Sequence, residues 1–284
     1  MLKVILPQEY SFCFGVERAL ELAKKHMNDG ELFDTLGEII HNPHVVKEFE
    51  KKGIKVINKP EESKKRKILI RSHGVPPDVI EKIKSLKKEI IDATCPFVKH
   101  AHESAKKLVE EGYFLVIVGK KEHPEVIGIQ GYAHGKGCVV LKREEVSKLH
   151  LRGKKVGIVS QTTMLLSNVQ EVVNAILLQN PKEVRYINTR CSTTERRQNA
   201  TRELAKKVDV MVIVGGRHSS NTNRLYEIAK EYAPLAYFIE SYKELKPEWF
   251  LNAKVVGVTG GASTPKVDVL KVKETIEKIS QGGK

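Results

Sequence analysis

Three of the four cysteines in this 284-residue chain lie between a short apolar run and a segment with helical periodicity. They are Cys13, Cys95 and Cys191, spaced 82 and 96 residues apart. Structural zinc sites usually take cysteines in closely spaced pairs, which this sequence lacks. Three separate thiolates favour a [4Fe–4S] cluster, which normally has four cysteine ligands. With three, one iron stays open and can bind a substrate oxygen as a Lewis acid, so converging cysteines would indicate cluster-based substrate chemistry.

Polar side chains suited to an anion follow other apolar runs of the chain. They comprise His41, His73, His123, Thr162, Ser219, Ser220, Asn221 and Ser263. Hydroxyls, amides and backbone N–H groups at helix starts form anion sites, and histidines add charge-assisted donors. The serines and the asparagine are typical of a phosphate or diphosphate cradle. Glu125 is a candidate proton donor, because burial in a water-poor pocket would raise its pKa.

The fourth cysteine, Cys138, lies inside the apolar run 137–141 and has no polar junction beside it. We expect it to be a core residue of a strand rather than a ligand.

Short apolar runs alternate with amphipathic helical segments, the pattern of an α/β protein with mostly parallel sheets. Strands are predicted at 4–6, 67–70, 90–91, 114–118, 156–159, 184–187, 210–214 and 255–258. Helices are predicted at 16–27, 45–52, 78–87, 98–111, 165–180, 196–208, 223–232 and 267–280. Ligands of such sheets bind beyond the carboxyl ends of the strands, where the cysteines and polar residues fall.

The cysteine spacing divides the chain into three α/β units of similar size. We expect lobe 1 at residues 14–95, with Cys13 at its start and Cys95 at its end. Lobe 2 is expected at residues 96–187. Lobe 3 is expected to combine residues 188–284 with residues 1–13.

Composition excludes several classes of protein. Hydrophobic residues make up 40% of the chain and charged residues 30%, which argues against a disordered protein. No apolar run approaches the length of a membrane span, and no signal peptide is evident, so we expect a cytoplasmic protein without a membrane partner. The net charge of +14 comes mainly from lysines spread over predicted helices. This Lys/Glu-rich, thermophile-like surface carries no compact nucleic-acid motif, so we expect no nucleic-acid partner.

Nine short segments lie between residues 12 and 265: Phe12–Ala19, Gly37–Pro43, Ser72–Val75, Asp92–Pro96, His123–Val126, Ser160–Thr163, Arg197–Gln198, Ser219–Leu225 and Gly261–Ser263. In this order they closely resemble the 4-hydroxy-3-methylbut-2-enyl diphosphate reductase (LytB) family. The resemblance covers essentially the whole chain. It implies a three-lobed α/β trefoil around a central iron–sulfur cluster. It also implies the last step of the methylerythritol phosphate route to isoprenoids, an oxidoreductase reaction in which two electrons and two protons remove an allylic hydroxyl as water. The products are isopentenyl and dimethylallyl diphosphate.

The resemblance also implies roles for individual residues. By similarity, three irons are bound by Cys13, Cys95 and Cys191, and the fourth iron binds the substrate hydroxyl. Glu125 matches the family's proton-delivery carboxylate, and Thr162 matches a hydroxyl near the substrate OH group. The remaining matches are to diphosphate-binding positions: His41, His73, Ser219, Asn221 and Ser263, with Ser220 beside them, and His123, which also belongs to the proton network.

Three departures from the family pattern concern tuning rather than activity. Ser11 replaces a common glycine, and His44 stands where glutamine is common. Arg190, just before Cys191, replaces a usually apolar residue. Its cation would raise the reduction potential if it lay beside a cluster. Alternatively, the side chain is turned to solvent.

Two other functions remain open at this point. A quinolinate synthase-like enzyme would also use three cysteines around an open-iron cluster, although the His-Pro-Glu and Ser-Gln-Thr-Thr motifs argue against it. An iron–sulfur sensor or nucleic-acid-binding protein is suggested only by the charge. The sequence has no Rossmann glycine fingerprint and no flavin motif. We therefore expect electrons from another protein, a ferredoxin or flavodoxin, whose acidic surface would suit the basic chain.

Overall fold

The computed structural model describes residues 2–40 and 42–281. The chain divides into two compact units, which are described separately. Unit 1 comprises Met1–Glu17, Ile40–Val45 and Ser192–Lys284. Unit 2 comprises Arg18–Ile39 and Val46–Cys191.

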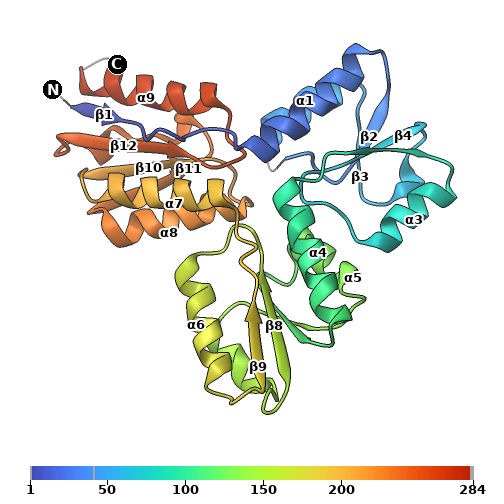
Figure 1. The fold of residues 1–284 in the computed structure, drawn as a ribbon. Coiled ribbons are helices and arrows are strands. Elements are labelled where there is room, and N and C mark those ends of the chain that lie inside the picture. The colour runs from blue at the N-terminus through green and yellow to red at the C-terminus, as the bar shows by residue number, and fades with distance from the viewer. Residues whose placement is uncertain (1, 41, 282–284) are drawn as a thin grey trace. The chain divides into compact units, whose positions relative to one another are not determined.

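Unit 1 contains one parallel sheet with strand order β1-β12-β10-β11 (Figure 1). Its strands are β1 (Lys3–Ile5), β10 (Val210–Val214), β11 (Leu235–Ile239) and β12 (Val255–Gly260). Its helices are α7 (Ser192–Ala205), α8 (Ser220–Tyr232) and α9 (Lys266–Ser280). Figure 1 shows α9 on one face of the sheet and α7 and α8 on the other.

Strand β10 explains this layering, because all five of its residues are buried. Val210, Val212 and Val214 pack into the cluster that contains residues of α9. Met211 and Ile213 point to the opposite face and pack against α7 and α8. A strand covered on both faces reads as a continuous apolar run, which is why the sequence identifies it easily.

Unit 2 contains two further parallel sheets. The first has the order β3-β2-β4-β5 and consists of β2 (Phe33–Leu36), β3 (Val56–Ile57), β4 (Lys67–Ile70) and β5 (Glu89–Asp92). Its sequence neighbours are α1 (Phe14–Asn28), α2 (Pro43–Lys51) and α3 (Pro77–Ser85). Helices α1 and α2 each begin in unit 1 and continue into unit 2.

The second sheet of unit 2 has the order β7-β6-β8-β9. It consists of β6 (Phe114–Val118), β7 (Cys138–Val140), β8 (Lys155–Ser160) and β9 (Glu183–Tyr186). One face packs on α6 (Leu166–Leu177), and the other packs on α4 (Pro96–Glu110) and α5 (Pro124–Tyr132). Within residues 2–40 and 42–281, no helix has the length and apolar content needed to cross a bilayer.

These sheets confirm the predicted fold class of three α/β lobes with parallel sheets. All of the predicted strands and helices are present, with ends that shift by a few residues. The prediction missed β2, β3, β11 and helix α5, and it recognised β7 only as a strand-like run. The lobe boundaries stay a prediction.

His102 joins α4 to α5. Its side chain is 3% exposed, and its ring stacks on Tyr132 at 4.4 Å between centroids, with an interplanar angle of 15°. The ring also lies against two glycines. A Cβ at Gly128 would be 2.6 Å from Nε2, and a Cβ at Gly74 would be 2.8 Å from Cε1. Burial lowers the pKa of His102 to about 4, so the ring is neutral at physiological pH.

This burial predicts a pH-dependent loss of stability. Because the folded pKa is about 4 and the ordinary pKa of histidine is 6.5, the unfolded chain binds the proton first as the pH falls. His102 therefore destabilises the protein progressively below about pH 6.5, by roughly 3 kcal/mol once the pH reaches 4. The variant His102→Gln should lose less thermal stability between pH 7 and pH 5 than the wild type. Circular dichroism of the full chain measures this, with His100→Gln on the exposed side of α4 as control. Equal losses in wild type and His102→Gln would contradict the assignment.

Candidate functional site

Each of the three predicted ligand cysteines directly precedes a helix. Cys13 precedes α1, Cys95 is the N-cap residue of α4, and Cys191 precedes α7. All three side chains are half-buried. Each cysteine thus lies at the positive end of a helix dipole, which stabilises negative charge. Thiolate is the form of cysteine that binds metals, so this donor set fits an iron–sulfur group.

The main chain holds each cysteine to a loop that follows a strand. The N–H of Cys95 donates to the carbonyl of Ser72 at 3.0 Å, and the N–H of Cys191 donates to the carbonyl of Thr162 at 2.9 Å. In unit 1, the N–H of Cys13 donates to the carbonyl of Ala262 at 3.0 Å. These acceptor loops carry three of the predicted substrate residues: His73, Thr162 and Ser263.

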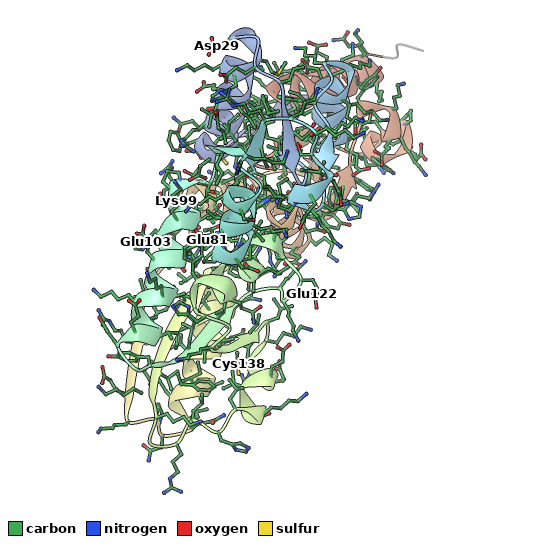
Figure 2. All side chains as sticks on the ribbon, turned by 90° about the vertical axis from the view of Figure 1, so that its right-hand side faces the viewer. Asp29, Glu81, Lys99, Glu103, Glu122 and Cys138 are labelled. Carbon is green, nitrogen blue, oxygen red and sulfur yellow. The ribbon has the colours of Figure 1, made fainter. Side chains whose placement is uncertain are left out.

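Unit 1 supplies Cys13, and unit 2 supplies Cys95 and Cys191. Among the described residues of either unit, no three His, Cys, Asp or Glu side chains are grouped closely enough to hold a metal ion. Cys138, labelled in Figure 2, lies on β7, which is at an edge of its sheet. The predicted strand position is confirmed. The expected core burial is wrong, because an edge strand leaves Cys138 half-buried.

Among the predicted site residues, Glu125 has a strongly shifted pKa and forms two hydrogen bonds with Thr162. Glu125 lies in the first turn of α5 and is 1% exposed. The Thr162 N–H donates to Oε1 at 2.6 Å, and the Thr162 hydroxyl donates to Oε2 at 2.9 Å. Burial raises the pKa of Glu125 to about 7, although both hydrogen bonds oppose the shift. The carboxyl group can therefore hold a proton near neutral pH and release it.

His123 caps the N-terminus of the same helix. It is the N-cap of α5, and its Nδ1 accepts the N–H of Glu125 at 3.2 Å. When Nδ1 accepts this hydrogen bond, the other ring nitrogen, Nε2, carries the proton of the neutral ring. The ring of His73 meets that of His123 edge to face, with 5.3 Å between centroids. The structure therefore brings His73, His123, Glu125 and Thr162 together within unit 2.

Unit 1 carries the predicted anion residues at the start of α8. Ser219 is the N-cap, and its hydroxyl accepts the N–H of Thr222 at 3.3 Å. Asn221 is 4% exposed, yet neither its Oδ1 nor its Nδ2 has a hydrogen-bond partner in the described part of the chain. A buried amide without partners is costly unless a ligand supplies them. Ser220 and Ser263 are also buried.

Two further predictions concern residues that bear on this site. Arg190 is 7% exposed, and its Nε donates to the carbonyl of Met164 at 2.9 Å, so the solvent-facing alternative is wrong. The guanidinium instead ties the residue before Cys191 to the loop after β8. Ser11 is half-buried. His41 lies outside the described residues, as does the side chain of His44.

The sequence prediction missed Gln161 as a positioning residue for this loop. Its buried side chain accepts the N–H of Lys120 at 3.2 Å and donates to the Thr163 hydroxyl at 3.1 Å. Gln161 thereby connects the loop after β6 to the loop that carries Thr162. The polar run Ser160–Thr163, which directly follows a strand, is the signal that could have identified it.

The perturbed carboxyl predicts that Glu125→Gln gains stability at high pH. The folded pKa of about 7 exceeds the ordinary glutamate value of 4.5, so the stability contributed by the protonated form is complete below about pH 4.5 and is lost as the pH rises through 7. Glutamine keeps the shape of the protonated acid and carries no charge. At pH 8.5 the variant should therefore unfold at a higher temperature than the wild type, by up to roughly 3 kcal/mol in free energy. The advantage should fall below about 1 kcal/mol at pH 5, and a variant that is less stable at pH 8.5 would refute the assigned shift.

The chain is similar over nearly its whole length to proteins of known name. The protein from Aquifex aeolicus (strain VF5) called 4-hydroxy-3-methylbut-2-enyl diphosphate reductase is 45% identical over 287 residues, covering 99% of this chain and 98% of its own. The protein of the same name from Geotalea daltonii is 44% identical over 280 residues, covering 99% of both chains.

Two solved structures are also similar. A structure of (E)-4-hydroxy-3-methyl-but-2-enyl diphosphate reductase, the terminal enzyme of the non-mevalonate pathway, has a TM-score of 0.71 at 44% identity, covering 98% of this chain and 100% of its own. The E-1-hydroxy-2-methyl-but-2-enyl-4-diphosphate reductase from Plasmodium falciparum has a TM-score of 0.90 at 27% identity, covering 96% and 87%. The family model described as LytB protein matches residues 4–277. With relatives of this identity over nearly its whole length, the chain belongs to the LytB family.

Proposed function

We propose that this chain is a 4-hydroxy-3-methylbut-2-enyl diphosphate reductase. It takes up two electrons and two protons, breaks the allylic C–O bond, and releases the hydroxyl as water, giving isopentenyl and dimethylallyl diphosphate. This is the last step of the methylerythritol phosphate route. The observation that carries the proposal is Glu125, in a chain of the LytB family. Its buried carboxyl has a pKa of about 7 and is hydrogen-bonded to the Thr162 hydroxyl.

Members of this family are iron–sulfur enzymes. In this chain, Cys13, Cys95 and Cys191 would hold a [4Fe–4S] cluster with one open iron. When bound, the cluster would supply the electrons and a Lewis acid for the substrate hydroxyl. The placement of each cysteine at a helix start, with its N–H anchored to a loop, supports this donor set.

The diphosphate would be bound by His41, His73, His123, Ser219, Ser220, Asn221 and Ser263. Asn221 gives the strongest support, because its buried amide has both a donor and an acceptor left unused by the described chain. The N-terminus of α8 adds N–H groups and a favourable dipole for an anion.

Proton delivery would begin at Glu125. Near neutral pH a substantial fraction of this carboxyl is protonated. The protonated carboxyl can donate to the Thr162 hydroxyl, which then has its own hydrogen available for the departing hydroxyl group. His123 fixes the helix start that carries Glu125 and contributes its Nε2–H to the same proton network.

The electrons would come from a ferredoxin or flavodoxin. A chain with a net charge of +14 would attract such acidic donors, and raised salt would slow the encounter. We place the reaction in the cytoplasm, with neither a nucleic acid nor a membrane as partner. A quinolinate synthase-like reaction or a sensor role is not favoured, because the relatives carry the reductase name over nearly the full chain.

The ligand assignment predicts a clear division among the cysteines. Cys13→Ser, Cys95→Ser and Cys191→Ser should each lose most bound iron and the brown absorbance after anaerobic purification, because each removes one thiolate ligand. Cys138→Ser, on an edge strand, should retain both. Iron and sulfide analysis measures this outcome. A Cys138→Ser protein without iron would contradict the assignment.

The proton-delivery assignment predicts that Glu125→Gln binds the allylic diphosphate normally but turns over about 10²–10⁴-fold more slowly, the usual contribution of a general acid. Steady-state reduction with an artificial electron donor gives kcat, and substrate titration gives the affinity. Iron content serves as the control for an intact cofactor. Turnover close to that of the wild type would remove Glu125 from the mechanism.

A further inference from the structure

The loop Gly260–Thr264, between β12 and α9, has four consecutive carbonyls that all accept hydrogen bonds. Gly260 accepts from Nη1 of Arg197 at 3.0 Å, and Gly261 accepts from the N–H of Thr264 at 3.0 Å. Ala262 accepts from the N–H of Cys13 at 3.0 Å. Ser263 accepts from Nδ2 of Asn42 at 3.3 Å. Three of these four donors lie more than 60 residues away in sequence, and all belong to unit 1.

The two side-chain donors are deeply buried. Arg197 is 2% exposed and is one of the largest fully buried side chains among the described residues. Burying a guanidinium costs free energy. The hydrogen bond from Arg197 to the Gly260 carbonyl is therefore a contact that the fold keeps despite this cost. Asn42 is 5% exposed and acts in two directions, since its Oδ1 also accepts the N–H of Val45 at 3.2 Å in the first turn of α2.

The loop itself has little room to move. A Cβ at Gly260 would overlap the carbonyl oxygen of Tyr10, and a Cβ at Gly261 would overlap Oγ1 of Thr222. The N–H of Gly261 and the hydroxyl of Thr264 both donate to the carbonyl of Val214, each at 2.9 Å. The end of β10 therefore holds the loop through the Val214 carbonyl. Arg197 and Asn42 hold it at two further carbonyls.

We propose that Arg197 and Asn42 are positioning residues that act through the loop Gly260–Thr264. The loop accepts the Cys13 N–H and carries Ser263, so it sets the placement of one iron ligand and one diphosphate ligand together. Arg197 governs the Gly260 end and, through it, Cys13. Asn42, the residue that follows His41, positions the Ser263 end and links it to the first turn of α2. This inference rests on the proposed function, because Cys13 and Ser263 take their roles from it.

Two variants separate hydrogen bonding from charge and capping. Asn42→Ser keeps a hydroxyl that can accept the Val45 N–H, but it is too short to reach the Ser263 carbonyl. Arg197→Lys keeps the charge but not the guanidinium geometry, so a purely electrostatic role would survive it. Matched controls are Asn199→Ser and Arg196→Lys, two exposed positions on α7 outside the loop contacts.

The experiment uses the anaerobically purified full chain with its cofactor. Asn42→Ser should raise KM and the Kd for inorganic diphosphate about 10-fold, the effect of one lost hydrogen bond, with kcat and iron content unchanged. Arg197→Lys should raise KM similarly and also alter the electron paramagnetic resonance spectrum of the reduced protein, since Cys13 shifts with the loop. Combined with Ser263→Ala, Asn42→Ser should add little, because both act on the same contact.

The controls should match the wild type in every readout. Variants that behave like their controls, or effects of Asn42→Ser and Ser263→Ala that simply add, would overturn this inference while the wild type remains active. A wild-type protein that holds no iron and does not reduce the allylic diphosphate would overturn the proposed function, and this inference with it.

Discussion

The site depends on a repeated main-chain hydrogen bond, in which a cysteine N–H donates to the carbonyl of a loop that follows a strand. Cys95 uses Ser72, Cys191 uses Thr162, and Cys13 uses Ala262. Because the acceptor loops also carry residues proposed to bind or protonate the substrate, ligand and substrate residues cannot move independently. This arrangement follows from the parallel sheets, because each sheet has the carboxyl ends of its strands, and therefore the loops that follow them, on the same side.

Burial sets the pKa values of Glu125 and His102. Glu125 lies at a helix N-terminus and accepts two hydrogen bonds, and all of these features favour its charged form. Desolvation outweighs them and raises its pKa to about 7. The same cause keeps the His102 ring neutral at the contact between α4 and α5. One carboxyl thus becomes a usable acid, and one imidazole becomes a packing group.

The sequence predicts buried parallel strands well. It fails where a buried polar side chain has its hydrogen-bond partner far away in the sequence. Strand β2 contains Asp34, which is buried because its carboxylate accepts from the Ser63 hydroxyl and from the Lys55 N–H. Helix α5 has apolar residues on all sides and two glycines, so no helical periodicity marks it. Arg190 is polar in sequence yet buried, since its partner is a carbonyl 26 residues away. The cysteines and Glu125 could be singled out because strand-to-helix junctions are visible locally, whereas their partners are not.

The three carbonyls that hold the cysteines belong to a serine, a threonine and an alanine. A main-chain acceptor places no demand on its own side chain, so these positions can differ in residue type while the bond stays the same. The chain therefore repeats one main-chain hydrogen bond at three places without repeating the residue type of the acceptor.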